Sequence, residues 1–413
     1  MTKPSLISLF TGAGGLDLGL HAAGFCTKVA VEMDSRCCET LRANSKRNYD
    51  WKVIQQPIES VSSSEILTAS GLRKGEADLL VGGPPCQPFS KSGFWARGDS
   101  GRLRDPRANT LREYLRVLED TLPKAFVLEN VAGLRFSGKE EGYRFIMEEI
   151  HRINSRTGSQ YSVHSKVLNT AWYGVPQTRE RIFLVASRDG LGFKFPDQTH
   201  YEAVYKEDLC DNQEPYRTTW DSIGDLGEPD DIEDLVVRGR WGELLPSIPE
   251  GQNYLFHTER GAGLPLFGWR RRYWSFLLKL AKNRPSWTIT AQPGPAIGPF
   301  HWNSRRLSPA ELARLQTFPD NYIVTGSLAD IQKQIGNAVP SLMGEILGLE
   351  IRRQLLGHQF ESGLSLLPPR RELVPPPAAA QPVHSKYIKY VGVHSAHPGT
   401  GLGYSALHRR SAA

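Results

Sequence analysis

Residues 6–20 read LISLFTGAGGLDLGL, an apolar run followed by a glycine-rich turn and the start of a helix. Such a run is typical of a buried strand, and the glycines allow a tight turn where a ligand can approach the N-terminus of the helix. The spacing departs from Gly-x-Gly-x-x-Gly, which argues against a dinucleotide oxidoreductase and favours another adenosine-bearing ligand. On this stretch alone, a nucleoside site and a plain structural turn are equally good interpretations.

Four further apolar runs follow, at residues 28–32, 78–82, 125–129 and 182–186. Each has the length of a buried strand, and the intervals between them are long enough for crossover helices. This pattern predicts an α/β fold with a doubly wound, mostly parallel sheet, in which ligands bind at the carboxyl ends of the strands. The second run ends in Glu32, whose carboxylate is placed to accept hydrogen bonds from a ribose.

Composition limits the possible classes of protein. The chain has 413 residues and a formal charge of +6, but residues 358–413 hold six Lys or Arg against two acids, so they supply +4 of that charge. Charge alone therefore does not predict a nucleic-acid partner. The five cysteines lack paired Cys-x-x-Cys spacing, which predicts no metal site and a reducing cytoplasm. No apolar stretch approaches the ~20 residues of a membrane span, so we expect neither secretion nor membrane insertion.

The pattern changes along the chain in a way that predicts two domains. Residues 1–200 carry the strand and helix pattern, and residues 201–330 are punctuated by Asp, Gly and Pro and rich in aromatic residues and arginine. A helical pattern over 341–356 predicts that residues 331–357 return to complete the first domain. Residues 358–413 are rich in Pro, Ala and Ser, and we expect a mostly disordered basic tail.

Three groups of residues are candidates for chemistry. Residues 81–93 read VGGPPCQPFSKSG, and a cysteine held rigidly after two prolines, Cys86, is placed for nucleophilic attack. The alternative for Cys86 is a buried structural cysteine. Glu129 ends an apolar run on the side of the sheet where ligands bind. The alternative for Glu129 is a solvated acid that caps a helix. Arg179 and Arg181 alternate along an extended segment and so project to one side, unless they form a surface charge pair.

Taken together, these motifs resemble the DNA (cytosine-5) methyltransferase family of bacterial restriction and modification systems, over most of residues 5–340. The matching segments, in chain order, are LFTGAGG at 9–15, PPCQ at 84–87, ENV at 129–131, QTRER at 177–181, RLS at 306–308 with RLQTFP at 314–319, and QIGNAVP at 334–340.

The resemblance implies roles for individual residues. Cys86 would attack carbon 6 of cytosine, Glu129 would stabilise ring nitrogen 3, Arg181 would hold the carbonyl oxygen, and Arg179 would support the same loop or acid. S-adenosylmethionine would be the cofactor, without a metal, and its site would consist of Phe10, Gly12, Gly14, Gly15, Leu16, Glu32, Met33, Pro85, Asn337 and Val339. The candidates for DNA contact are Gln87, Ser90, Ser92, Arg270, Arg271 and Arg272. One feature departs from the family, because residues 56–58 read QPI and offer no carboxylate to the adenine amino group.

The activity that the resemblance implies is methylation of a cytosine flipped out of double-stranded DNA, within a sequence read by residues 201–330 as a smaller, irregular target-recognition domain. A cognate restriction endonuclease would cut the same sequence without stable association, and we expect a monomer in the bacterial cytosol or nucleoid. Three alternatives stay open: a methyltransferase acting on transfer RNA, an inactive binding module on the same fold, and a nicotinamide dehydrogenase. Methylation assays on both nucleic acids and a test of S-adenosylmethionine binding distinguish them.

Overall fold

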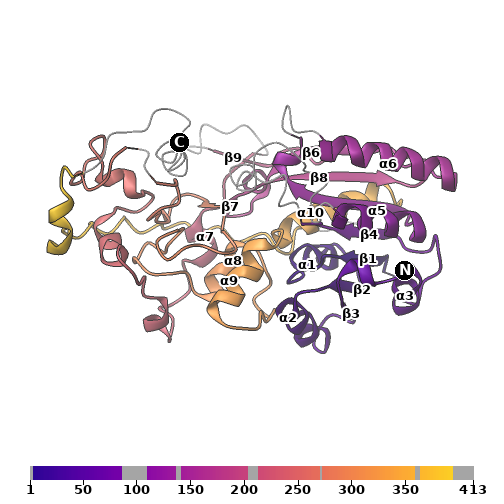
Figure 1. The fold of residues 1–413 in the computed structure, drawn as a ribbon, viewed down its shortest axis with the longest axis horizontal. Coiled ribbons are helices and arrows are strands. Elements are labelled where there is room, and N and C mark those ends of the chain that lie inside the picture. Colours follow the sequence, from indigo (N-terminus) through magenta and orange to yellow (C-terminus); the bar gives the residue numbers. More distant parts are fainter. Residues whose placement is uncertain are drawn as a thin grey trace, which may run out of the picture.

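A computed structural model describes residues 3–85, 109–135, 141–202, 213–269, 272–358 and 363–393. Its centre is a seven-stranded sheet in the order β3-β2-β1-β4-β5-β8-β6 (Figure 1). The strands are β1 Ser5–Leu9, β2 Cys26–Glu32, β3 Lys52–Gln55, β4 Leu79–Gly82, β5 Ala125–Val131, β6 His164–Asn169 and β8 Glu180–Ser187. The neighbours from β3 to β5 pair in parallel, and β8 runs antiparallel between β5 and β6. The predicted α/β fold with a mostly parallel sheet is therefore confirmed.

All five predicted apolar runs lie in strands of this sheet, namely β1, β2, β4, β5 and β8. The sequence did not reveal β3 and β6. These two strands form the edges of the sheet, and their side chains are mostly half-buried or exposed. An edge strand has fewer buried positions, so it lacks the apolar run by which a central strand is recognised.

Helices cover both faces of the sheet. One face packs against α3, α5 and α6, and the other against α1 and α10. The helices are α1 Gly15–Ala22, α2 Ser35–Ser45, α3 Ser63–Ser70, α5 Asn109–Thr121, α6 Glu141–Thr157, α7 Thr219–Ile223, α8 Pro309–Leu315, α9 Leu328–Asn337 and α10 Ser341–Gln354. The backbones of α1 and α10 touch, because a Cβ atom on Gly19 would lie 1.8 Å from the carbonyl oxygen of Ser341. The helix predicted over 341–356 is thus α10, and it packs against the first helix of the chain.

The described residues between 213 and 307, called here the second region, are irregular, whereas the predicted irregular stretch 201–330 also contains α8 and the start of α9. They contain α7, the two-residue strands β10 Glu214–Pro215 and β11 Ser286–Trp287, and several short 3-10 helices. β10 pairs with β9 His200–Tyr201, and β11 pairs with β7 Gln177–Thr178 just before β8. Two apolar clusters hold the second region together, one around Tyr254 and Phe276 and one around Leu280 and Trp302. The domain boundaries at 200, 330 and 357 stay a prediction.

The prediction of a mostly disordered tail over 358–413 is wrong for residues 363–393. These residues run from α10 over the second region, in yellow at the left of Figure 1, and end in the 3-10 helix η11 Ser385–Tyr390. Leu364, Leu366 and Leu367 pack against the core of the sheet, and the side chain of Tyr387 is 1% exposed. A few apolar residues at the two ends therefore anchor a segment whose Pro- and Ala-rich middle resembles disordered sequence.

Candidate active site

The turn between β1 and α1 brings the predicted cofactor residues to the carboxyl edge of the sheet. Phe10, Gly12 and Gly14 have φ angles of 53°, 58° and 82°, so the backbone is left-handed at all three positions. A Cβ on Gly12 would meet no atom within 4 Å, whereas one on Gly15 would lie 2.4 Å from the carbonyl oxygen of Val339. Gly12 therefore borders open space, and Gly15 allows the segment after α9 to pack closely on the turn.

Glu32 joins the ends of two neighbouring strands. Its Oε2 accepts a hydrogen bond from the N–H of Gly12 at 2.8 Å, and its Oε1 accepts from Met33 and Asp34, each at 2.8 Å. Burial raises the pKa of the Glu32 carboxyl, and these three N–H groups oppose that shift. A carboxylate oxygen has two acceptor sites, so Oε2 keeps one for a hydroxyl group.

The remaining cofactor candidates border the same turn. Leu16 is buried in the core between α1 and the sheet, and Met33 is 67% exposed beside Glu32. Asn337 is exposed at the end of α9, which an ion pair of 2.6 Å between Lys333 and Asp34 ties to the segment after Glu32. The structure thus brings residues 10–16, Glu32 and the end of α9 together, although more than 290 residues separate the last two.

At the next strands along the same edge, Glu129 and Arg181 form an ion pair, with 2.9 Å between Oε1 and Nε. β5 and β8 run antiparallel, and Arg181 lies opposite Val131 in their register, two residues beyond Glu129. Both side chains are mostly buried, at 13% and 18% exposure. Burial raises the pKa of the Glu129 carboxyl, while the guanidinium groups of Arg181 and Arg179 oppose the shift without cancelling it. The buried acid is thereby shifted towards its protonated form.

The chain that leads to Cys86 lies directly against this pair. A Cβ on Gly83 would be 2.8 Å from Oε2 of Glu129, a separation that real Cβ atoms do not show. The Nδ2 of Asn130 donates to the carbonyl oxygen of Pro84 at 3.3 Å, and its Oδ1 accepts from Val131 N at 2.8 Å. The residues that follow β4, Gly83 and Pro84, are therefore held in contact with the Glu129 carboxyl and its neighbour Asn130. Pro85, the last described residue before Cys86, is exposed at this edge.

Arg179 has different partners from Arg181. Its side chain is 2% exposed and donates to three backbone carbonyls, those of Gly336 at 2.9 Å, Asn337 at 3.4 Å and Ile289 at 3.4 Å. Among the described residues, no hydrogen bond joins it to Glu129. A cation at the C-terminus of α9 complements the helix dipole. Arg179 thus connects the end of α9, the second region and the strand that carries Arg181.

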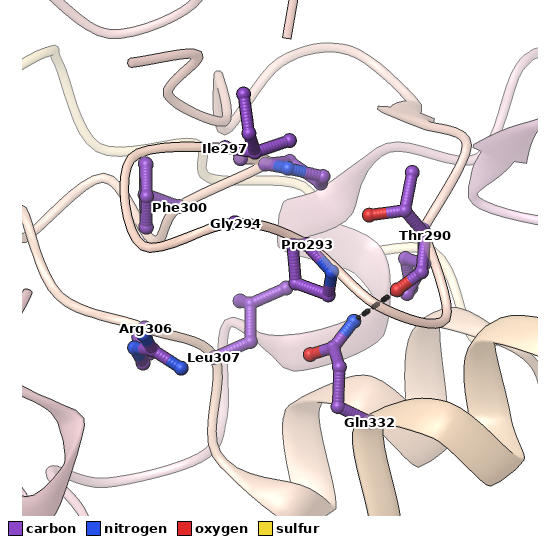
Figure 2. A pocket seen from close by; sticks show the side chains of 11 residues that line it. Thr290, Pro293, Gly294, Ile297, Phe300, Arg306, Leu307 and Gln332 are labelled. Carbon is purple, nitrogen blue, oxygen red and sulfur yellow. Dashed lines mark hydrogen bonds between the residues drawn. The ribbon is translucent and has the colours of Figure 1, made fainter. Parts of the chain in front are cut away.

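A shallow hollow lies behind Ile289, where the second region meets α9 (Figure 2). The Nε2 of Gln332 donates to the carbonyl oxygen of Thr290 at 2.6 Å, and both residues line the hollow. The lining residues are Ile289, Thr290, Pro293, Gly294, Ile297, Gly298, Pro299, Phe300, Arg306, Leu307 and Gln332. The hollow therefore borders the contact between α9 and the loop that Arg179 holds, rather than the Glu129 pair.

Several predicted site residues lie outside the described residues: Cys86, Gln87, Ser90, Ser92, Arg270 and Arg271. Arg272 is described and exposed, with its guanidinium 5.4 Å from the ring centre of Phe276. Sequence patterns assigned no individual role to Gly83 or Asn130, which hold the end of β4 against Glu129. Gly83 precedes Pro84 and Asn130 follows Glu129 in the sequence. This adjacency could have identified both residues as part of the site, because residues at the ends of neighbouring strands meet at one edge of the sheet.

In the part of the chain that the structure describes, no three His, Cys, Asp or Glu residues gather as a metal site would require. Within the same residues, no helix combines the length and the apolar character needed to cross a membrane.

Comparisons with known proteins extend over most of the chain. The family described as C-5 cytosine-specific DNA methylase matches residues 5–353. The chain is 38% identical to the type II methyltransferase M.SacI of Streptomyces achromogenes, over 85% of this chain and 93% of that protein. It is 34% identical to the type II methyltransferase M1.HphI of Haemophilus parahaemolyticus, over 83% of this chain and 84% of that protein.

Solved structures share the fold. The Entamoeba histolytica methyltransferase EhMeth superimposes with a TM-score of 0.57 at 16% sequence identity, over 86% of this chain and 99% of that one. The solved structures show the fold alone, whereas the family match and the relatives also show the family. The chain belongs to the C-5 cytosine-specific DNA methylase family and is a DNA (cytosine-5) methyltransferase of the type II restriction and modification kind.

Proposed function

We propose that this enzyme methylates carbon 5 of a cytosine flipped out of double-stranded DNA, through a covalent adduct with Cys86. The observation that carries the proposal is the buried Glu129 and Arg181 pair, which lies against the backbone of Gly83 and Pro84 just before Cys86. The acid and the guanidinium group lie at one edge of the sheet, and the sequence supplies a nucleophile, Cys86, two residues after Pro84. This is the set that activation of a pyrimidine ring requires.

The side-by-side arrangement of Glu129 and Arg181 matches one edge of cytosine. Ring nitrogen 3 and the oxygen on carbon 2 are adjacent acceptors, so a protonated carboxyl and a guanidinium group that lie in contact can each donate to one of them. Uracil and thymine carry a proton on nitrogen 3, which would face the donated proton of Glu129. The pair therefore favours cytosine, and the raised pKa of Glu129 supports the protonated form that this role needs.

The chemistry begins when the Cys86 thiolate forms a bond to carbon 6. The electrons of the 5,6 double bond then shift towards carbon 5 and, by conjugation, towards nitrogen 3 and the oxygen on carbon 2. Glu129 stabilises the charge that develops at nitrogen 3, and Arg181 stabilises the oxygen on carbon 2. S-adenosylmethionine, when bound, supplies an electrophilic methyl group. After carbon 5 is methylated, its proton is lost to solvent, the 5,6 double bond forms again, and the bond to Cys86 breaks with release of the thiolate. The target base must leave the stack for this, which costs a few kcal/mol.

The turn after β1 fits the cofactor. Gly12 borders open space, Oε2 of Glu32 has an acceptor site free for a ribose hydroxyl, and Asn337 is exposed beside the turn. Phe10 would lie at the adenine. Other residues that the resemblance assigns would border the ligand through their backbone or side chains: Gly14, Gly15, Leu16, Met33, Pro85 and Val339. Arg179 would act indirectly, by holding the end of α9 where Asn337 lies.

The second region offers a surface for the DNA. Beside the predicted contacts Arg270, Arg271 and Arg272, the side chains of Tyr273 and Trp274 are 82% and 57% exposed. The turn that carries them is fixed, because the Nδ2 of the buried Asn253 donates to the carbonyl oxygen of Trp274 at 2.7 Å. Arginine next to exposed aromatic rings suits both phosphate and base contacts. Gln87, Ser90 and Ser92 would approach the DNA from the loop after Cys86.

The test is transfer of labelled methyl groups from S-adenosylmethionine to unmethylated genomic DNA, followed by digestion and mass spectrometry of the nucleosides. The proposal expects label in 5-methylcytosine, and expects none with Cys86→Ser. Methylation of transfer RNA but not DNA would overturn the substrate assignment. A role in protection predicts that DNA modified in a host cell resists a restriction endonuclease of the same sequence specificity.

A further inference from the structure

We propose that residues 363–393, called here the strap, position the second region over the active site and so determine how target DNA is presented to Glu129. The inference rests on the proposed function and assigns work to a segment that follows the matched family residues 5–353. The strap contacts the catalytic sheet, then α7, and finally the core of the second region.

The first anchor is a buried carboxylate in α10. Glu345 is 1% exposed, and it accepts hydrogen bonds from the N and Oγ of Ser365, both at 2.6 Å, and from the N of Leu366 at 2.9 Å. Leu367 then packs on the loop before β7, because a Cβ on Gly174 would lie 2.4 Å from its Cδ1. Gly174 is three residues before Gln177, where the segment that carries Arg179 and Arg181 begins. The strap thus starts against elements that form the active site.

The second anchor is an ionic network at α7. The N of Arg371 donates to Oδ1 of Asp221 at 2.8 Å, and its guanidinium lies 2.7 Å from Asp225. Asp225 also pairs with Arg314 of α8 at 2.7 Å, and Arg314 pairs with Asp320 at 2.8 Å. Asp221 is 2% exposed, so this contact is fixed rather than a loose surface pair. A network of several charges is more rigid than one exposed ion pair.

The third anchor lies in the core of the second region. Tyr387 stacks on Trp241 with 5.6 Å between ring centres and 14° between planes, and its hydroxyl donates to the carbonyl oxygen of Arg240 at 2.9 Å. Between the second and third anchors, residues 372–380 are exposed and contact the protein at few points, such as Pro376 with Lys282. The strap therefore joins α10 and the sheet, through its first anchor, to the second region, through its second and third anchors.

Such a bridge limits movement between the parts that it joins. Interfaces between two parts of one chain permit relative motion unless they are large, and a segment anchored on both sides reduces that freedom. In this enzyme the active site lies at the edge of the sheet, whereas the aromatic turn at 273–274 belongs to the second region. The distance between the active site and this turn determines whether a cytosine of bound DNA can reach Glu129. The cofactor contacts lie at the strand ends and at the end of α9, which Lys333 and Arg179 hold without the strap, so we expect cofactor binding to be independent of this distance.

The main test cuts the strap between its first anchor, on α10 and the sheet, and its second anchor, at α7. A site-specific protease sequence is inserted after the exposed Pro369, and the folded full-length protein is assayed before and after cleavage. We expect the KM for DNA to rise on the order of tenfold upon cleavage, with kcat within about twofold and the affinity for S-adenosylmethionine unchanged. The uncut insertion protein is the control. An unchanged KM with the released segment still bound would overturn the proposal.

A point variant provides a second measurement. Arg371→Ala removes the guanidinium contacts of the middle anchor, with Asp225 and the carbonyl oxygen of Asp221, and should also raise the KM for DNA. Arg353→Ala, which removes an exposed pair with Glu350 inside α10, should not. If Arg371→Ala lowers kcat, cofactor affinity and melting temperature together, its role is general stability and the proposal fails.

A readout that does not depend on activity separates this proposal from the proposed function. One fluorophore is placed on α3 and one on the second region. The distribution of distances between them should become broader after cleavage. If the uncut protein methylates no DNA while this distribution broadens, the function assignment fails and the strap's role in holding the two parts stands. A distribution unchanged by cleavage refutes the strap's role, whatever the substrate.

Discussion

Replacing Gly83 with alanine tests the contact between the end of β4 and the catalytic acid. The new Cβ would lie 2.8 Å from Oε2 of Glu129, a carboxyl that cannot move freely because Arg181 holds its other oxygen at 2.9 Å. Elsewhere in a protein, Gly→Ala at a compatible φ stabilises by about 0.4–1 kcal/mol. Here overpacking should reverse the sign and cost about 1–3 kcal/mol of unfolding free energy.

The effect on activity should exceed the effect on stability. A shift of the Glu129 carboxyl by a fraction of an ångström misaligns its hydrogen bond to the base, which should lower kcat by about 100-fold. Methyl transfer at saturating cofactor and DNA measures this loss. Gly192→Ala is the matched control, since its Cβ would meet no atom within 4 Å.

A thermodynamic cycle identifies the cause. In a Glu129→Ala background the added methyl group of Gly83→Ala has no carboxyl to meet, so its cost in unfolding free energy should disappear. Gly83→Ala with kcat within twofold of wild type, or an equal stability cost in both backgrounds, would refute the reasoning.

Three further perturbations have defined outcomes. Asp17 is fully buried, and burial raises its pKa to about 7 from 3.8, so its contribution to stability is complete below pH 3.8 and is lost as pH rises to about 7. The difference in unfolding free energy between wild type and Asp17→Asn should fall by about 1.4 kcal/mol per pH unit in that window and stay flat above it, and a difference independent of pH would contradict this. Arg179→Met should leave buried carbonyls unpaired and lower the unfolding free energy in urea by about 2–4 kcal/mol, with weaker cofactor binding in calorimetry; wild-type stability would show that the three hydrogen bonds contribute nothing. Trp274→Ala should weaken DNA binding about 5- to 100-fold in a filter-binding assay without changing cofactor affinity, while Leu264→Ala, another exposed apolar residue of the second region, should have no effect; equal behaviour of the two variants would remove Trp274 from the DNA surface.

The centre of the fold was predictable because its strands are buried on both faces and so read as short apolar runs. The same logic found Glu129, at the end of one such strand, and Arg181, at the start of another. Their direct contact follows from the antiparallel pairing of β5 with β8, which neither strand reveals alone. The edge strands β3 and β6 were missed because half-buried strands carry mixed side chains.

Contacts between distant segments account for the other differences. Arg179 was expected to support the same loop or the acid, and its hydrogen bonds run to carbonyls more than 100 residues away in the sequence. The tail was expected to be disordered because its composition is rich in Pro and Ala. Its order depends on a few anchors, such as Tyr387 on Trp241 and Ser365 on Glu345, which no local pattern reveals.

The most direct test of the central claim follows the proton on carbon 5. DNA labelled with tritium at carbon 5 of cytosine is incubated with the enzyme and S-adenosylmethionine, and tritium released to water is counted against methyl groups transferred. We expect one tritium to be released for each methyl group transferred, and neither release nor transfer with Cys86→Ser. Methyl transfer without tritium release would place the new group on another atom of the base and contradict the proposed chemistry.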